Sequence, residues 1–110
     1  MNFEILRTDI FSKHLKFLAK KYPSLKKDYF LLLQSLEINP SMGTPLGKSC
    51  YKIRLKIASK SAGKSGGARV ITYVKIERKR ITLLDIFDKG DKDTIPDKEL
   101  SGLIKKAEDV

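Results

Sequence analysis

The residues in this chain best placed to do chemistry lie in "CYKIRLKI", residues 50–57. Side chains alternate between the two faces of a strand, so Lys52, Arg54 and Lys56 would share one face and the apolar residues between them the other. Like charges on one face repel each other, and nothing within this stretch offsets them. We therefore expect the basic face to receive an anion.

The next strand-like stretch, residues 69–76, extends this surface. If Arg69 and Lys75 share the basic face, they form a concave cationic surface with Ile71 and Tyr73 as its floor. Between residues 50 and 80 the chain has ten Lys or Arg and one acidic residue. The alternative is a solvated sheet face, although exposed faces usually mix charges of both signs.

The connection between these two stretches resembles a nucleotide-binding P-loop at first sight. Residues 63–65, "GKS", fit the end of that motif, but Ala58 stands where its first glycine should be. A P-loop leads into a helix, whereas β-branched residues typical of a strand follow here. We expect a glycine-rich loop between two strands, with Lys60 and Lys64 overhanging the basic face and able to close over a ligand.

Such a face could cleave RNA without a metal ion. The reaction must deprotonate a 2′-hydroxyl, stabilise a pentavalent phosphorane and protonate the leaving 5′-oxygen. Arginine suits the second task, and a lysine among other cations, such as Lys52, can serve as acid or base. The only histidine, His14, falls on a predicted helix, and no carboxylate cluster suited to magnesium lies on this face. Catalysis would be mainly electrostatic and slow unless another molecule orients the substrate.

The overall charge also indicates an anionic partner. Twenty-three Lys and Arg against 13 Asp and Glu give a net charge of +10. Nucleic acid is the first candidate, an acidic protein the second and a membrane surface a distant third. No apolar stretch reaches the roughly 18 residues that span a bilayer, and the N-terminus does not resemble a signal peptide. The single cysteine, Cys50, provides neither a disulfide nor a metal cluster. We expect a cytoplasmic protein without a cofactor.

The elements that would position these residues begin with a short strand at residues 2–6. A helix capped by Thr8 or Asp9 follows and ends near Tyr22. Ser24 is the expected N-cap of a second helix, which stops before Asn39. Because the turn between them is short, the two helices should form an antiparallel hairpin.

The rest of the chain is expected to form the sheet. Residues 38–49 read as an irregular crossing, and residues 50–57, 69–76 and 81–87 as an antiparallel meander. Thr94-x-x-Asp97 would begin a short C-terminal helix. The sequence thus predicts one α+β domain, residues 1–110, with an N-terminal strand and helical hairpin packed on a small, mainly antiparallel sheet.

Three segments, taken in order, resemble the RelE/ParE toxin superfamily of bacterial toxin–antitoxin systems, and most closely its RelE and HigB branches. They are "GTPLGKSCYKIRLKI", "GKSGGARVITYVKI" and "ITLLDIFDKGDKDTI". The resemblance covers nearly the whole chain. It implies the RelE-like fold and a metal-independent endoribonuclease that cleaves messenger RNA in the ribosomal A site. The implied partners are the ribosome, messenger RNA and a cognate antitoxin, which should be acidic where it covers the basic face.

The resemblance assigns roles to particular residues. Lys52 and Arg54 fall on the basic strand positions of the RelE active site. Arg69 falls on the arginine that holds the scissile phosphate, in "GARV". These three residues form the core of the catalytic set that the resemblance implies.

The segment after the last strand fits less well. RelE-type sites take a basic residue and a tyrosine from it. Here Phe87 is the aromatic, which can stack on a base but cannot exchange a proton, and Pro96 stands at the later tyrosine position. Lys89 completes the catalytic set, with Lys92 as the other candidate. The missing acid or base could then be Lys52 or Lys56, or Tyr73 if it faces the site.

The expected contacts with RNA or the ribosome come from basic and aromatic side chains around this surface and at the helix corner. They are Lys56, Lys60, Lys64, Tyr73, Phe87 and Lys92, with Lys20, Lys21, Lys26 and Lys27 at the corner. The corner lysines could equally be a solvated turn. Residues 97–110 could be either a flap over the active site or ordinary packing.

Two other functions remain open at this point. One is a ParE-like inhibitor of DNA gyrase on the same fold, and the other is a non-catalytic basic RNA-binding module. The triplet of Lys52, Arg54 and Arg69 favours the nuclease, because a gyrase binder does not need to stabilise a phosphorane. Phe87 in place of a tyrosine favours the gyrase inhibitor mildly.

Overall fold

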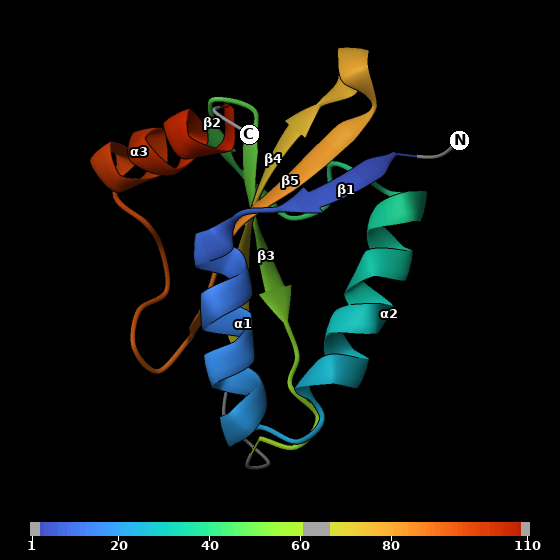
Figure 1. The fold of residues 1–110 in the computed structure, drawn as a ribbon, viewed down its shortest axis with the longest axis vertical. Helices are drawn as coiled ribbons and strands as arrows, with labels where there is room; N and C mark the ends of the chain where they lie inside the picture. Colours follow the sequence, from blue (N-terminus) through green and yellow to red (C-terminus); the bar gives the residue numbers. More distant parts are fainter. Residues whose placement is uncertain (1–2, 61–66, 109–110) are drawn as a thin grey trace.

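The computed structural model describes residues 3–60 and 67–108 of this chain (Figure 1). Its elements are β1 (Glu4–Arg7), α1 (Asp9–Lys21), α2 (Leu25–Ile38), β2 (Thr44–Gly47), β3 (Cys50–Leu55), β4 (Ala68–Lys75), the 3-10 turn η1 (Ile76–Arg78), β5 (Arg80–Asp88) and α3 (Asp97–Glu108). The expected helices and strands are present, with ends that differ by one or two residues.

The five strands form one sheet in the order β1-β5-β4-β3-β2. β3, β4 and β5 make the predicted antiparallel meander, and β1 pairs in parallel with β5. The α+β, mainly antiparallel architecture is therefore confirmed.

The strand β2 was not predicted. Residues 44–47 pair antiparallel with β3, where an irregular crossing was expected. Lys48 and Ser49 connect the two strands with positive φ angles of 57° and 63°. Two such residues make the tight turn that suits a hairpin, but Asn and Gly usually occupy those positions. A lysine and a serine occupy this turn, and a proline and a glycine lie in the strand itself. The hairpin therefore could not be predicted from residue types.

Local caps explain where the helices begin. The Thr8 hydroxyl accepts a hydrogen bond from the backbone N–H of Phe11 at 3.0 Å, so Thr8 is the one of the two candidate residues that caps α1. Ser24 precedes α2 as expected, but its side chain does not cap the helix. Its hydroxyl instead donates to the buried carboxylate of Asp28 at 2.7 Å. Asp28 also accepts from the backbone N–H of Ala58, which ties the helix corner to the chain after β3.

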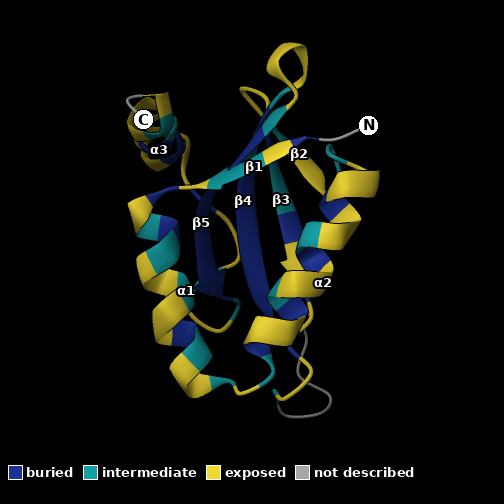
Figure 2. Ribbon diagram, turned by 45° about the vertical axis from the view of Figure 1, so that its right-hand side comes forward, coloured by how far each residue is buried: buried dark blue, intermediate teal, exposed yellow. Residues whose placement is uncertain are grey.

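Apolar clusters cover both faces of the sheet, and β4 and β5 are buried along most of their length (Figure 2). The cluster beneath the hairpin of α1 and α2 is the larger one and includes Phe11, Leu18, Leu25, Leu36, Ile53, Val70, Leu83 and Ile86. The second cluster joins α3 to the opposite face through Cys50, Ile71, Leu84, Phe87, Leu100 and Leu103. The C-terminal helix is thus packed into the fold. No helix in the described ranges is long and apolar enough to cross a membrane.

Candidate nucleic-acid interface and active site

Strand register brings the predicted catalytic residues together. In the antiparallel pair of β3 and β4, Arg54 lies opposite Arg69, and Lys52 lies opposite Ile71. Directly opposed residues share a face of a sheet, so Lys52, Arg54 and Arg69 all lie on the same face. That part of the prediction is confirmed.

Arg69 is held rigidly in this arrangement. Only 2% of the residue is exposed, and its Nε donates to Oδ1 of Asp93 at 2.7 Å. Its Nη1 donates to the backbone carbonyl of Ala68 at 3.2 Å. Lys52 Nζ reaches the same loop residue and donates to the backbone carbonyl of Asp93 at 3.0 Å. Asp93, in the connection between β5 and α3, therefore links two of the predicted catalytic cations.

The carboxylate of Asp93 already behaves as an anion bound to this site. The hydrogen bond from Arg69 lowers the pKa of Asp93, and the charges of Lys52 and Lys89 act in the same direction. Half of the Asp93 side chain is exposed, so the ion pair lies at the mouth of the site and not beneath it. Asp93 is not among the predicted site residues, because its position in the sequence after the last strand gives no signal of this contact.

The prediction that Ile71 and Tyr73 form the open floor of a concave cationic surface is wrong. Ile71 is completely buried in the cluster beneath α3. Tyr73 is half-buried, and its hydroxyl donates to the Glu108 carboxylate at the end of α3 at 3.0 Å. Since apolar side chains of α3 cover the middle of this face, the basic residues form separate groups at its two ends. Of the two roles considered for the C-terminal segment, packing is the one the structure shows for α3.

Phe87 is not available to stack on a base as expected. It lies opposite Arg69 in the sheet, is 8% exposed and belongs to the cluster beneath α3. The ammonium of Lys92 lies 4.7 Å from the centre of its ring and pairs with Glu99 at 3.1 Å. Burial in this cluster and the contact with Lys92 explain the difference. Lys89 is half-buried at the start of the same connection.

Lys60 does not overhang the basic face. Its ammonium donates to Oδ1 of Asp88 at 2.7 Å and to the backbone carbonyl of Gly67 at 3.1 Å, and its side chain is only 17% exposed. Tyr22 donates to the other oxygen of Asp88 at 2.6 Å. Burial by itself would raise the pKa of Asp88, but these hydrogen bonds, one from the backbone N–H of Gly90 and the nearby lysine charge together lower that pKa to about 2. Lys60 is thus drawn into a largely buried ion pair.

The remaining predicted contact residues are on the surface. Lys56 and the corner lysines Lys20, Lys21, Lys26 and Lys27 are exposed. Lys64 lies outside the described residues, as does the loop tip expected to close over a ligand. The strand β4 follows at Ala68, where a P-loop would require a helix, so the P-loop reading is excluded.

Cys50 and His14, which were not assigned to the site, each have a defined environment in the structure. Cys50 is buried, which raises the pKa of its thiol to about 11. His14 is half-exposed on α1, and its Nδ1 lies 2.7 Å from Oδ1 of Asp85, a buried carboxylate that also accepts from the backbone N–H of Ile86. Within the described ranges, no group of three or more His, Cys, Asp or Glu is arranged to hold a metal ion.

This chain shares its fold, with the helical hairpin on one face of the sheet and α3 on the other, with the E. coli toxin RelE. The free E. coli toxin RelE, in a variant with two arginines replaced by alanine, superposes on this chain with a TM-score of 0.61 and 17% identity. The alignment covers 96% of this chain and 98% of that one. The intact E. coli RelBE toxin–antitoxin complex matches over 78% of this chain and 95% of the aligned chain, with a TM-score of 0.50 and 21% identity. No family model matches the sequence.

Proposed function

We propose that this protein is the toxin of a type II toxin–antitoxin system and acts as a ribosome-dependent messenger-RNA endoribonuclease. The observation that carries the proposal is the rigid placement of Arg69 on the same sheet face as Lys52 and Arg54, with a carboxylate already bound to it. The fold, shared with the E. coli toxin RelE and with a chain of the RelBE toxin–antitoxin complex, supports the same assignment.

The bound carboxylate indicates which group Arg69 would hold. A phosphodiester offers negatively charged oxygens like those of Asp93, and a guanidinium can bind two of them at once. RNA entering the site would displace Asp93 and leave Arg69 facing the scissile phosphate, with Arg54 beside it. These fixed charges would stabilise the phosphorane that forms as the 2′-hydroxyl attacks.

Proton transfer would fall to lysines. Tyr73 is the wrong residue for this role, because it lies toward the other end of α3 and its pKa is raised by burial and by its hydrogen bond to Glu108. Lys52 lies within reach of the Asp93 loop, and Lys89 begins that loop. We assign the removal and return of the proton to these two residues, without a cofactor. The ribosome would supply the substrate orientation that this minimal set lacks.

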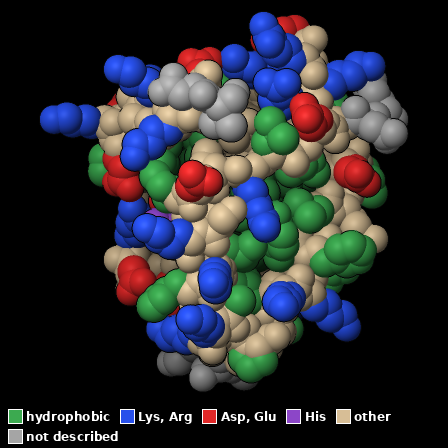
Figure 3. Space-filling model, viewed as in Figure 1, with side chains coloured by type: hydrophobic (Ala, Val, Ile, Leu, Met, Phe, Trp, Pro, Cys, Tyr) green, Lys and Arg blue, Asp and Glu red, His purple; other side chains and the backbone are tan. Residues whose placement is uncertain are grey.

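The proposed antitoxin would be acidic where it covers the basic face, which the net charge of +10 favours. An apolar groove of about 490 Å³ runs between α1 and α2, with Leu15, Ala19 and Tyr29 among its lining residues and Lys16 and Lys26 at its sides. Figure 3 shows hydrophobic side chains exposed on this face, with lysines and arginines around them. A helix with one apolar and one acidic face would suit this groove.

The test is primer extension on a messenger RNA in programmed ribosomes. The intact protein, Arg69→Ala and Arg69→Lys are compared, with Lys13→Ala as a control that removes an exposed charge elsewhere. We expect cleavage at the A site by the intact protein and by Lys13→Ala, and a loss of about a hundredfold or more in both Arg69 variants. Thermal unfolding of each variant checks that it remains folded.

Other outcomes select the alternatives. Inhibition of gyrase supercoiling without RNA cleavage would identify a ParE-like inhibitor. Salt-sensitive RNA binding without cleavage on or off the ribosome would identify a non-catalytic RNA-binding module. Cleavage that survives in a folded Arg69→Ala variant would place the active site elsewhere.

A further inference from the structure

A second group of cations lies far from Arg69, where β4, β5 and the end of α3 meet. It surrounds a cavity of about 290 Å³ whose lining includes Tyr73, Lys75, Arg78, Arg80 and Glu108. Lys75 lies six positions after Arg69 along β4, which corresponds to about 20 Å of extended strand. We propose that this cavity, here called the distal pocket, is a second phosphate-binding site that holds the backbone of RNA. The choice of RNA as the source of the phosphate rests on the proposed function.

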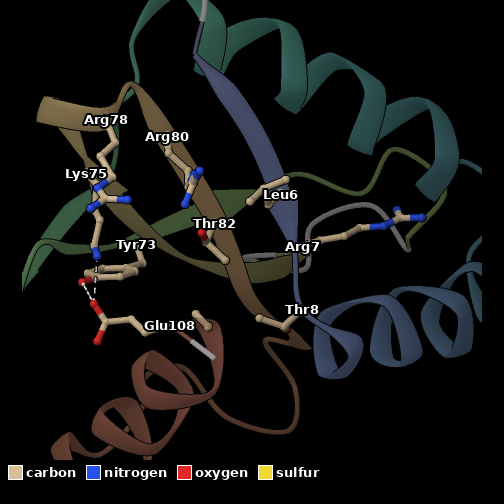
Figure 4. A pocket seen from close by; sticks show the side chains of 10 residues that line it. Leu6, Arg7, Thr8, Tyr73, Lys75, Arg78, Arg80, Thr82 and Glu108 are labelled. Carbon is tan, nitrogen blue, oxygen red and sulfur yellow. Dashed lines mark hydrogen bonds and ion pairs between the residues drawn. The ribbon is translucent and has the colours of Figure 1, made fainter. Parts of the chain in front are cut away.

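The donors of the distal pocket already converge on an oxyanion. Glu108 Oε2 accepts from Lys75 Nζ at 2.9 Å and from the Tyr73 hydroxyl at 3.0 Å, as the dashed lines in Figure 4 show. Lys75 is itself only partly exposed. The hydrogen bonds from Lys75 and Tyr73 lower the pKa of Glu108, so the carboxylate is held as an anion.

The Glu108 carboxylate does not neutralise all the basic side chains that line the distal pocket. The Arg78 guanidinium forms no hydrogen bond or ion pair within the part of the chain that the structure describes. Arg80 pairs with Glu4 at 3.2 Å, but both side chains are more than a third exposed, and such surface pairs contribute little. Arg7 also lines the cavity, yet it points away from the other cations and bonds to the Tyr29 hydroxyl (Figure 4).

The charge of the lining favours an anionic backbone that carries one phosphate per nucleotide. Each phosphodiester has two non-bridging oxygens, which can accept from lysine or from the forked guanidinium of an arginine, and Lys75, Arg78 and Arg80 offer such donors. Glu108 is the only acidic residue among those that line the cavity, against four basic ones. Glu108 occupies the donors that a phosphate would use, so it acts as an internal competitor at the end of α3.

The distal pocket is distinct from the site around Arg69. The apolar packing of Leu100 and Leu103 on Ile71 and Leu84 lies between the two sites. An RNA strand bound at both sites would therefore cross α3 or pass around it. This arrangement would add affinity and fix the direction of the strand without any further catalytic residue.

The test measures the binding of a short 2′-O-methyl RNA, which cannot be cleaved, to the full chain by fluorescence anisotropy across a salt series. The variants are Arg78→Ala/Arg80→Ala and Glu108→Gln. Lys13→Ala/Lys98→Ala, which removes two exposed charges elsewhere, is the matched control. Inorganic tripolyphosphate and an oligoglutamate peptide are added as competitors.

If the inference is right, the double arginine variant binds the RNA about tenfold more weakly at low salt. Its slope of log affinity against log salt also falls by roughly 1.4, since each phosphate contact on a single strand contributes about 0.7. The lysine control changes far less. Glu108→Gln binds severalfold more tightly, and tripolyphosphate competes with the intact protein but only weakly with the double arginine variant.

If the arginine variant and the lysine control lose RNA affinity equally, the inference is overturned, because the loss would then be a general effect of charge. Preferential displacement of the RNA by oligoglutamate would also overturn it, and would point to an acidic protein in the pocket. Because the RNA cannot be cleaved, the result does not depend on nuclease activity. A protein that fails to cut messenger RNA on ribosomes yet shows the expected binding pattern would refute the proposed function and leave the distal pocket standing.

Discussion

Replacing Asp88 with asparagine should destabilise the protein strongly and in a pH-dependent way. The pKa of Asp88 is about 2 in the folded protein, against an ordinary value of 3.8. At about 1.4 kcal/mol per pKa unit, ionised Asp88 contributes about 2 kcal/mol to the free energy of unfolding at pH 7. Its side chain is only 6% exposed, so solvent screens this contribution little. The variant also leaves Lys60 with a largely buried charge and no counter-ion, so we expect a total loss of about 3 kcal/mol.

The pH dependence follows from the sign of the shift. Because the folded-state pKa lies below the unfolded one, the contribution of Asp88 is complete above about pH 5. It is lost as the pH falls through 3.8 toward 2. At pH 3 about half of it remains. The difference in stability between the intact protein and Asp88→Asn should therefore shrink on acidification.

Urea unfolding followed by circular dichroism at pH 7, 5 and 3 measures both effects. Glu77→Gln, which neutralises an exposed carboxylate, is the control and should stay within about 0.5 kcal/mol of the intact protein. A loss of less than about 1 kcal/mol in Asp88→Asn at pH 7 would refute the argument. The argument would also be refuted if the stability difference between the intact protein and Asp88→Asn were the same at pH 7 and pH 3.

Three further predictions concern single residues. Asp93→Asn removes the carboxylate that occupies Arg69, so the non-cleavable RNA should bind about threefold to tenfold more tightly in anisotropy; weaker binding would mean that Asp93 mainly orients the arginine. Gly67→Ala should lower the free energy of unfolding in urea by about 2 kcal/mol or more, because Gly67 has φ +51° and a β-carbon there would clash with the carbonyl oxygen of Leu55. An unchanged stability would show that the chain shifts there without cost. In the folded protein, Cys50 should react with iodoacetamide at neutral pH far more slowly than a free thiol, because burial raises the pKa of its thiol to about 11. Unfolding in urea should restore the reaction. Rapid labelling of the folded protein would contradict the position of Cys50 in the core.

Much of the fold could be predicted because its signals are local. The alternation of charged and apolar residues in β3 predicted both the strand and its basic face, and the cap at Thr8 marked the start of α1. The candidate site was predictable in part, since a meander with short connections places Arg54 and Arg69 on adjacent strands. The exposed lysines at the helix corner were also found as the sequence suggested.

The errors concern the partners of individual side chains. The family resemblance places Phe87 where it could stack on a base, and the glycine-rich loop places Lys60 over the basic face. In the structure Phe87 is buried in the apolar cluster that joins α3 to the sheet, and Lys60 pairs with Asp88. Asp93 and Glu108 looked like ordinary acidic residues near a terminus, yet they bind the cations at the two ends of the basic face.

The sequence by itself determined the charge of the protein, the type and approximate ends of its main helices and strands, and the side chains that share a strand face. These properties depend on residue type, on period and on contacts within a few residues. The tertiary structure decided which cations are paired and which remain open to a ligand. Arg69 meets a residue 24 positions away, Lys60 meets one 28 away, and Tyr22 meets Asp88 across 66. Such pairs depend on strand register and on where α3 packs, and a local pattern contains neither.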